Sequence, residues 1–127
     1  MQDSQNNKIT SADMASAFTY LLESGFEISG QVTTPEKAAV GFKGNEINIR
    51  LFFEYREGNF DFSVINSHNS AIHKPIWRIL KHFDADLNLA DLTPKDLNDK
   101  QTLNFIAQKF KVVLQSIKDD PGVLTQI

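Results

Sequence analysis

The sequence predicts an α+β fold: an N-terminal helix, a four-stranded antiparallel meander and two to three C-terminal helices, in the order α-β-β-β-β-α-α and in two layers. Apolar and polar residues alternate from Ala38 to Ile65 across two turns, as in half-buried strands. The segments before and after this stretch carry apolar residues at the three-to-four spacing of helices. A chain of 127 residues with no linker or repeat is expected to form one domain, covering residues 10–127.

The second turn of the stretch, Arg56 to Asn59, contains a glycine and separates two aromatic-rich runs, which is typical of a hairpin. A register in which Arg56 faces Asn59 predicts three apolar pairs on one face: Tyr55 with Phe60, Phe53 with Phe62, and Leu51 with Val64.

The first turn is Gly44-Asn45, with glycine where a type II′ turn requires a positive φ. Pairing across this turn predicts Lys43 opposite Glu46, Phe42 opposite Ile47, Val40 opposite Ile49, and Ala38 opposite Leu51. Both turns, taken independently, place the same residues of the middle strand on the inner face. Because a slip of one residue would invert every side chain, this agreement supports the assignment of faces.

Residues 1–9 are polar and are expected to be a disordered lead-in. Thr10 has the character of a helix N-cap, with Asp13 in the capping-box position, and the helix is predicted over Ser11–Ser24. Gly25 then fits a left-handed C-cap, with Phe26 folding back over the last turn. A first strand is predicted from Glu27 to Val32, with Val32 opposite Ala38 and Ile28 opposite Phe42.

After Ile65 the sequence predicts a polar loop, Asn66–Ser70, and then a helix that begins at Pro75 and carries Trp77 at its margin. A short helical turn is expected at Thr93–Asp96. The last helix, capped by Asn98 or Asp99, has an unbroken apolar stripe consisting of Leu103, Ile106, Ala107, Phe110, Val113, Leu114 and Ile117.

Composition excludes several classes of function. A net charge of −3 and a pI near 5.5 argue against general nucleic-acid binding and against adhesion to anionic membranes. The chain has no cysteine, no hydrophobic signal-peptide core and no apolar run of membrane length. A cytoplasmic location is therefore the default expectation.

Two features of the sequence partly resemble metal sites. Asp84, Asp86 and Asn88 match the opening of an EF-hand calcium loop, but the positions that need glycine and glutamate hold Leu89 and Lys95. The three histidines, His68, His73 and His82, lack the spacing of a helical zinc pair. We therefore predict no metal and no cofactor.

Glu54 and Asp61 are predicted to face each other across the second hairpin, where close carboxylates could perturb each other's pKa. This end of the hairpin is expected to be exposed to solvent, which favours ordinary surface carboxylates. The chain contains no glycine-rich phosphate loop and no nucleophile elbow. We predict no catalytic residue, and a non-enzymatic role is preferred although an enzyme is left open.

The outer face of the predicted sheet carries Arg50, Phe52 and Ile65 as a candidate interaction surface. The predicted register places Arg50 between Ala39 and Ile65, and Phe52 between Lys37 and Ser63. The alternative is that the C-terminal helices cover Phe52 and Ile65, in which case the face is part of the core.

The segment Asp84–Asp99 holds five aspartates and one lysine, whereas Lys74–Lys81 holds three cations and no acid. Such an acidic edge could steer a charged partner, although a solvated face is the simpler interpretation. Asp84, Asp86 and Asp91 are the candidate partner-binding residues of this segment.

Three sequence stretches, "YLLESGF", "INIRLFFEYREGNFDFSVI" and "PIWRIL", occur in this order between Tyr20 and Leu80. In this order the chain resembles small bacterial α+β proteins of uncharacterised families, some of which are similar to immunity proteins that neutralise polymorphic toxins. The resemblance implies a cytosolic, non-enzymatic protein that binds another protein. The outer face and the acidic segment, identified above from register and charge, are the expected binding surfaces. The alternatives are a small-molecule binder or enzyme, with a pocket lined by Trp77, His73 or His82, and a homodimer formed through the outer face.

Overall fold

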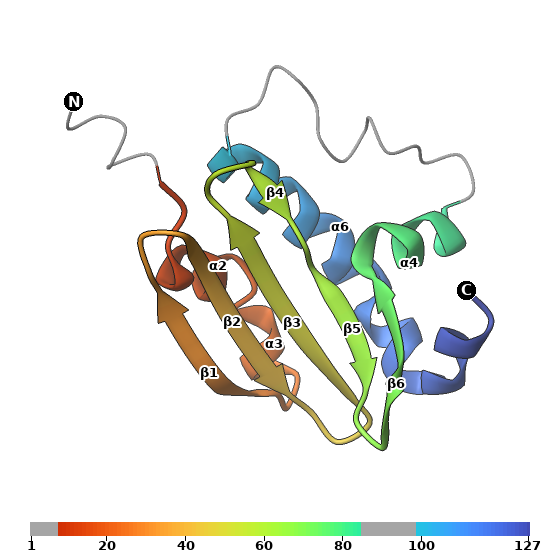
Figure 1. Cartoon of the computed structure of the whole chain (residues 1–127). Helices are drawn as coiled ribbons and strands as arrows, with labels where there is room; N and C mark the ends of the chain where they lie inside the picture. Colours follow the sequence, from red (N-terminus) through yellow and green to blue (C-terminus); the bar gives the residue numbers. More distant parts are fainter. Residues whose placement is uncertain (1–7, 85–98) are drawn as a thin grey trace.

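The computed structural model describes residues 8–84 and 99–127, which form an antiparallel sheet with helices on one of its faces (Figure 1). The elements are α2 (Ser11–Ala17), α3 (Tyr20–Glu23), β1 (Glu27–Thr33), β2 (Lys37–Lys43), β3 (Ile47–Glu54), β4 (Asn59–Phe60), β5 (Ser63–Asn66), β6 (Asn69–Pro75), α4 (Ile76–Phe83), α6 (Asp99–Asp119) and the 3-10 helix η1 (Pro121–Thr125). The α+β class is confirmed. The sheet of the described residues has six strands rather than four, ordered β1-β2-β3-β5-β6 with β4 paired to β3.

The first helix begins as predicted, with a capping box at Thr10. The Thr10 hydroxyl accepts a hydrogen bond from the Asp13 N–H at 3.2 Å, and the Asp13 carboxylate accepts one from the Thr10 N–H at 2.9 Å. The predicted single helix is divided at Phe18 and Thr19 into α2 and α3. Phe18 and Leu21, on either side of the division, are both fully buried.

The turn into the sheet also matches its prediction. Gly25 has a φ of 95°, and the N–H of Phe26 donates back to the carbonyl of Leu21 at 3.0 Å. The Phe26 ring is buried, so the end of α3 is fixed by both a hydrogen bond and apolar packing.

The two hairpins keep the predicted faces but not the predicted partners. In the β2–β3 pair, Val40 lies opposite Leu51 and Phe42 opposite Ile49, two residues away from the expected register. The β3–β5 pair is displaced by the same amount, with Val64 opposite Ile49. Because side chains alternate with a period of two, a displacement of two residues leaves every side chain on its predicted face.

The β1–β2 pair behaves differently, because it contains a bulge. Ile28 faces Phe42 as predicted, but the register shifts between Ile28 and Gly30, so that Val32 faces Ala39 instead of Ala38. A shift of one residue inverts the alternation, and Val32 therefore lies on the outer face of the sheet. The prediction of an inner Val32 is wrong.

Gly44 is needed for space rather than for a positive φ, contrary to the prediction. Among the glycines that the structure describes, only Gly25 and Gly58 have a positive φ. A Cβ atom on Gly44 would lie 2.7 Å from the carbonyl oxygen of Ile47 and 2.7 Å from the ring of Phe26. The glycine allows the β2–β3 turn to pack directly against Phe26.

Strand β6 was missed by the sequence analysis, which predicted a polar loop over Asn66–Ser70. Asn66 faces Asn69 across a tight turn, and Val64 faces Lys74 in the pair β5–β6. The segment from Asn69 to Pro75 is mostly polar and has one large aliphatic residue, Ile72. Such an edge strand has no alternating apolar signal from which it could be recognised.

The core lies between the sheet and the helices α2, α3 and α6, and α4 and η1 also contribute buried residues to it (Figure 1). The predicted stripe of the last helix is buried except for Val113, which is half-buried. Ile9 was expected to be part of the lead-in, but it is fully buried and its carbonyl accepts a hydrogen bond of 2.6 Å from the Tyr55 hydroxyl. The ordered packing therefore includes Ile9. The predicted turn at Thr93–Asp96 lies outside the described residues.

Candidate functional site

The outer face of the sheet is the candidate site, because the described helices pack against the opposite face. In β2 and β3 the residues directed toward the helices are buried, whereas their neighbours are half-buried or exposed. Figure 1 shows α2, α3 and α6 on the far side of the sheet, and α4 beyond the β6 edge. We call this outer surface the open face; its central residues are Val32, Ala39, Gly41, Asn48, Arg50, Phe52, Ser63 and Ile65.

Arg50 lies in the middle of the open face and is exposed. Its cross-strand neighbours are Gly41 on β2 and Ser63 on β5, rather than the predicted Ala39 and Ile65. Both neighbours are small, and the Ser29 side chain lies against Gly41.

The two predicted apolar residues of the open face are both half-buried. Phe52 lies opposite Ala39, and the Lys37 ammonium is 5.3 Å from the centre of its ring, a cation–π contact. Ile65 lies between Asn48 and His73. Ile65 therefore lies two residues along β5 from the partner of Arg50, Ser63. All three predicted residues remain on one surface.

Ser63 is the functional candidate that the sequence analysis missed. It is only 4% exposed, and its hydroxyl is the buried side-chain polar atom, among the described residues, that has no hydrogen-bond partner. The alternation placed Ser63 on the outer face, but a serine on an outer face is expected to be solvated. Its burial depends on the actual register, which no local sequence signal specifies.

The acidic candidates are not brought to the open face. Asp84 follows α4, where its N–H donates to the carbonyl of Leu80 at 2.9 Å, and it lines a hollow with Lys109 and Val112 of α6. Asp84 thus belongs to the helical side of the molecule. Asp86 and Asp91 lie outside the described residues.

Each of the three histidines has a different contact. His68 lies 3.5 Å from Glu46, the His73 ring nitrogen Nδ1 is 3.3 Å from the carbonyl oxygen of Ser70, and the His82 ring contacts Phe83. Within residues 8–84 and 99–127, no three potential metal ligands are grouped together.

The predicted carboxylate pair does not form. Glu54 faces Asn59 instead of Asp61, because the turn between the strands is longer than expected. The Glu54 carboxylate accepts a hydrogen bond from the N–H of Glu57 at 2.8 Å, which closes this turn. Glu54 therefore has a structural partner and does not face a second acid.

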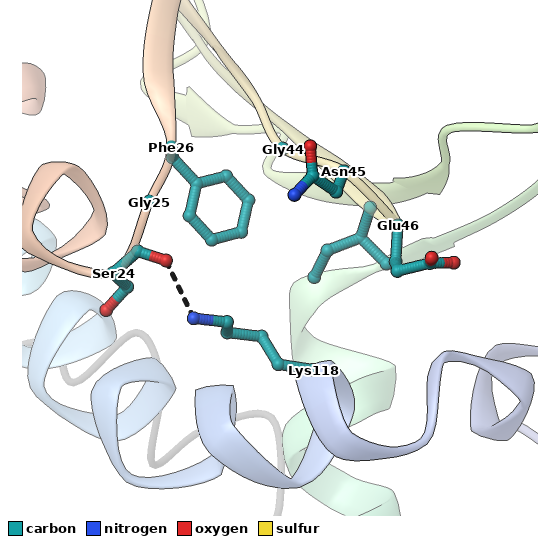
Figure 2. A pocket seen from close by; sticks show the side chains of 8 residues that line it. Ser24, Gly25, Phe26, Gly44, Asn45, Glu46 and Lys118 are labelled. Atoms are coloured by element: carbon teal, nitrogen blue, oxygen red, sulfur yellow. Dashed lines mark hydrogen bonds between the residues drawn. The ribbon is translucent and has the colours of Figure 1, made fainter.

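A hollow of about 200 Å³ lies between the C-terminal end of α3, the β2–β3 turn and the end of α6 (Figure 2). Figure 2 shows Lys118 reaching into it, where the ammonium donates to the carbonyl of Ser24 at 2.7 Å beside the ring of Phe26. The second hollow, of about 170 Å³, is the one beside Asp84. Neither is lined by Trp77, His73 or His82, the residues predicted for a pocket.

Two tyrosines have a perturbed pKa, and both are structural. Burial raises the pKa of Tyr20, whose hydroxyl donates to the carbonyl of Ala107 at 2.7 Å. Burial, together with the negative charge of Asp13, raises the pKa of Tyr55. Both groups are neutral donors to backbone carbonyls at neutral pH, which is a packing role rather than acid–base chemistry.

In the part of the chain that the structure describes, no helix combines the length and the apolar composition needed to cross a membrane. Comparisons of the chain with protein-family models, with curated proteins and with solved structures find no match.

Proposed function

We propose that the protein is a non-enzymatic binding module that engages another protein through the open face of its sheet. The observation that carries the proposal is the placement of α2, α3 and α6 on one side, which leaves Arg50 and Phe52 at the surface on the other (Figure 1). An arginine and an aromatic residue at the centre of a surface are the residue types that most often dominate binding energy.

The size of the open face suits a small or transient interface. Five strands in the order β1-β2-β3-β5-β6, spaced about 4.8 Å apart and about 24 Å long, give a face of roughly 500 Å². A standard interface buries about 800 Å² on each partner. A partner that binds here is therefore expected to associate reversibly, or to extend its contact beyond the sheet.

The resemblance to immunity proteins supports one mode of action within this proposal. A protein of this type acts by covering a functional surface of its partner, which requires shape and charge complementarity and no reacting group. Asp84, on the helical side, and the acidic positions Asp86 and Asp91 would supply additional contacts for a partner that extends beyond the sheet.

Cross-linking followed by copurification from the native host tests the proposal. The wild-type chain is expected to retain a partner that is lost with Arg50→Glu and with Phe52→Ala. The matched controls are Arg78→Glu and Val112→Ala, exposed residues of α4 and α6 away from the sheet, which are expected to retain it.

A protein that stays a lone monomer, or a partner retained equally by all four variants, would contradict the proposal. A doubled solution mass that is abolished by the two open-face variants would identify a second copy of the chain as the occupant.

The hollow beside Lys118 gives the small-molecule alternative little support. Ligand pockets usually have volumes of about 300–1,000 Å³, and this hollow, at about 200 Å³, is below that range. Its one cation, Lys118, is already bonded to the carbonyl of Ser24.

A further inference from the structure

Arg50 has no acidic partner among the residues that the structure describes. The ion pairs among residues 8–84 and 99–127 join His68 to Glu46 and Lys100 to Asp13, so no described carboxylate pairs with Arg50. Its neighbours on the open face are also uncharged: Gly41 and Ser63 across the strands, and Asn48 and Phe52 along β3. An arginine in such surroundings keeps all its donors available.

The hydroxyl of Ser63, directly beside Arg50 in the register, is buried without a partner. A buried polar group without a hydrogen bond is unfavourable, and such groups in folded proteins call for a specific explanation. A partner that brings an acceptor to this position would satisfy the hydroxyl.

Arg50 is the flexible neighbour of Ser63 across the strands. Only Arg50 and Pro75 flank Ser63 across the strands, and of these two only Arg50 has a long, flexible side chain. Cross-strand neighbours have Cβ atoms about 5 Å apart, so the arginine side chain can lie over Ser63 or swing away from it. An anion bound by the guanidinium therefore lies on the same part of the open face as Ser63.

We propose that Arg50 and Ser63 together form a carboxylate-recognition site that takes an aspartate or glutamate side chain of the partner. The inference rests on the proposed function of the open face, and it adds the chemistry of the group recognised. The planar guanidinium donates two parallel hydrogen bonds to the carboxylate, and the Ser63 hydroxyl donates a third to a remaining lone pair. One cation and one hydroxyl match a singly charged carboxylate better than a doubly charged phosphate.

A titration followed by amide NMR shifts tests the site with two peptides, acetyl-Gly-Glu-Gly-amide and acetyl-Gly-Gln-Gly-amide. They differ only in a carboxylate and an amide of equal size. The glutamate peptide is expected to cause saturable shifts at the amides of Arg50, Ser63 and Gly41, with at least tenfold tighter binding than the glutamine peptide.

Four variants separate the contributions. Arg50→Gln is expected to lower the affinity for the glutamate peptide by about tenfold or more, and Arg50→Lys by less. Ser63→Ala is expected to lower it by about threefold to tenfold. The control is Lys43→Gln, an exposed cation of the same face that faces Asn48 instead of Ser63, and it is expected to change the affinity less than twofold.

Equal shifts with both peptides, equal affinity in Arg50→Gln and wild type, or tighter binding of inorganic phosphate would overturn the inference. Failure of the carboxylate site can be distinguished from failure of the proposed function. A partner lost with Phe52→Ala but bound equally by wild type and Arg50→Gln would refute the carboxylate site alone. A partner unaffected by every open-face variant would refute the docking face itself.

Discussion

Two buried serines have opposite hydrogen-bonding states, and this contrast predicts opposite effects of the same substitution. The Ser11 hydroxyl accepts a hydrogen bond from the Thr33 hydroxyl at 2.8 Å, whereas the Ser63 hydroxyl has no partner. Ser11→Ala is expected to lower the free energy of unfolding by about 1 kcal/mol, and Ser63→Ala to raise it by about 0.5–1 kcal/mol. Urea unfolding of both variants measures the difference, and a destabilised Ser63→Ala would show that its hydroxyl is satisfied.

Gly44 and Gly30 provide a second matched pair of residues. A Cβ on Gly44 would meet the Ile47 carbonyl and the Phe26 ring at 2.7 Å, whereas one on Gly30 has nothing within 4 Å. Gly44→Ala is therefore expected to lower the free energy of unfolding by about 1–3 kcal/mol, and Gly30→Ala to change it by less than about 0.5 kcal/mol. Equal midpoints of thermal unfolding for the two variants would contradict the packing assigned to Gly44.

At the scale of elements, β1 is the strand with the least burial. All of its residues are exposed, and it is paired only on one edge, with β2. Local opening of such a strand costs less free energy than opening of β3, which is paired on both edges and has a buried inner face. Hydrogen exchange is therefore expected to be at least tenfold faster for β1 amides than for β3 amides. Equal protection of the two strands would contradict this.

Elements also show which predictions a sequence can support. The inner and outer faces of β2 and β3 were correct although both registers were off by two residues, because an even displacement preserves the faces. Turn lengths determine the actual partners, and neither turn has a sequence that fixes its length. The bulge after Ile28 inverts the alternation of side chains in the rest of β1, and Val32 therefore lies on the face opposite to the predicted one. Strand β6, with little apolar alternation, gave no signal.

The same reasoning explains how much of the site was predictable. The alternation of side chains alone assigned three residues to one surface, and the structure places them there: Arg50, Phe52 and Ile65. The role of Ser63 could not be predicted, because its burial depends on which residues flank it across the strands. Asp84 was proposed as a partner-binding residue from the charge of its segment, and charge contains no information about which layer a residue joins.

At the scale of the whole molecule, Tyr20 connects α3 to α6. Its hydroxyl donates to the carbonyl of Ala107 at 2.7 Å, and burial raises its pKa above the value in the unfolded chain. The folded state therefore keeps the proton at a pH where the unfolded state releases it. This contribution to stability is complete below pH 10 and is lost as the pH rises above it.

The free energy of unfolding is accordingly expected to fall between pH 10 and pH 12, and to fall less steeply in Tyr20→Phe. Urea midpoints across this range measure both slopes. The variant should also be less stable than wild type at pH 8, since it lacks the hydrogen bond to Ala107. Parallel pH profiles for the two proteins would show that another group causes the alkaline loss.

The contact between Tyr20 and Ala107 also constrains how the protein can fold during its synthesis. The two residues are 87 positions apart, and a ribosome that adds 5–20 residues per second needs roughly 4–17 s to make the intervening chain. The sheet is complete in sequence at Pro75, but α6 follows only from Asp99. From the synthesis of Pro75 until α6 has been made, the nascent chain therefore holds a complete set of strands without α6 to cover their apolar inner face.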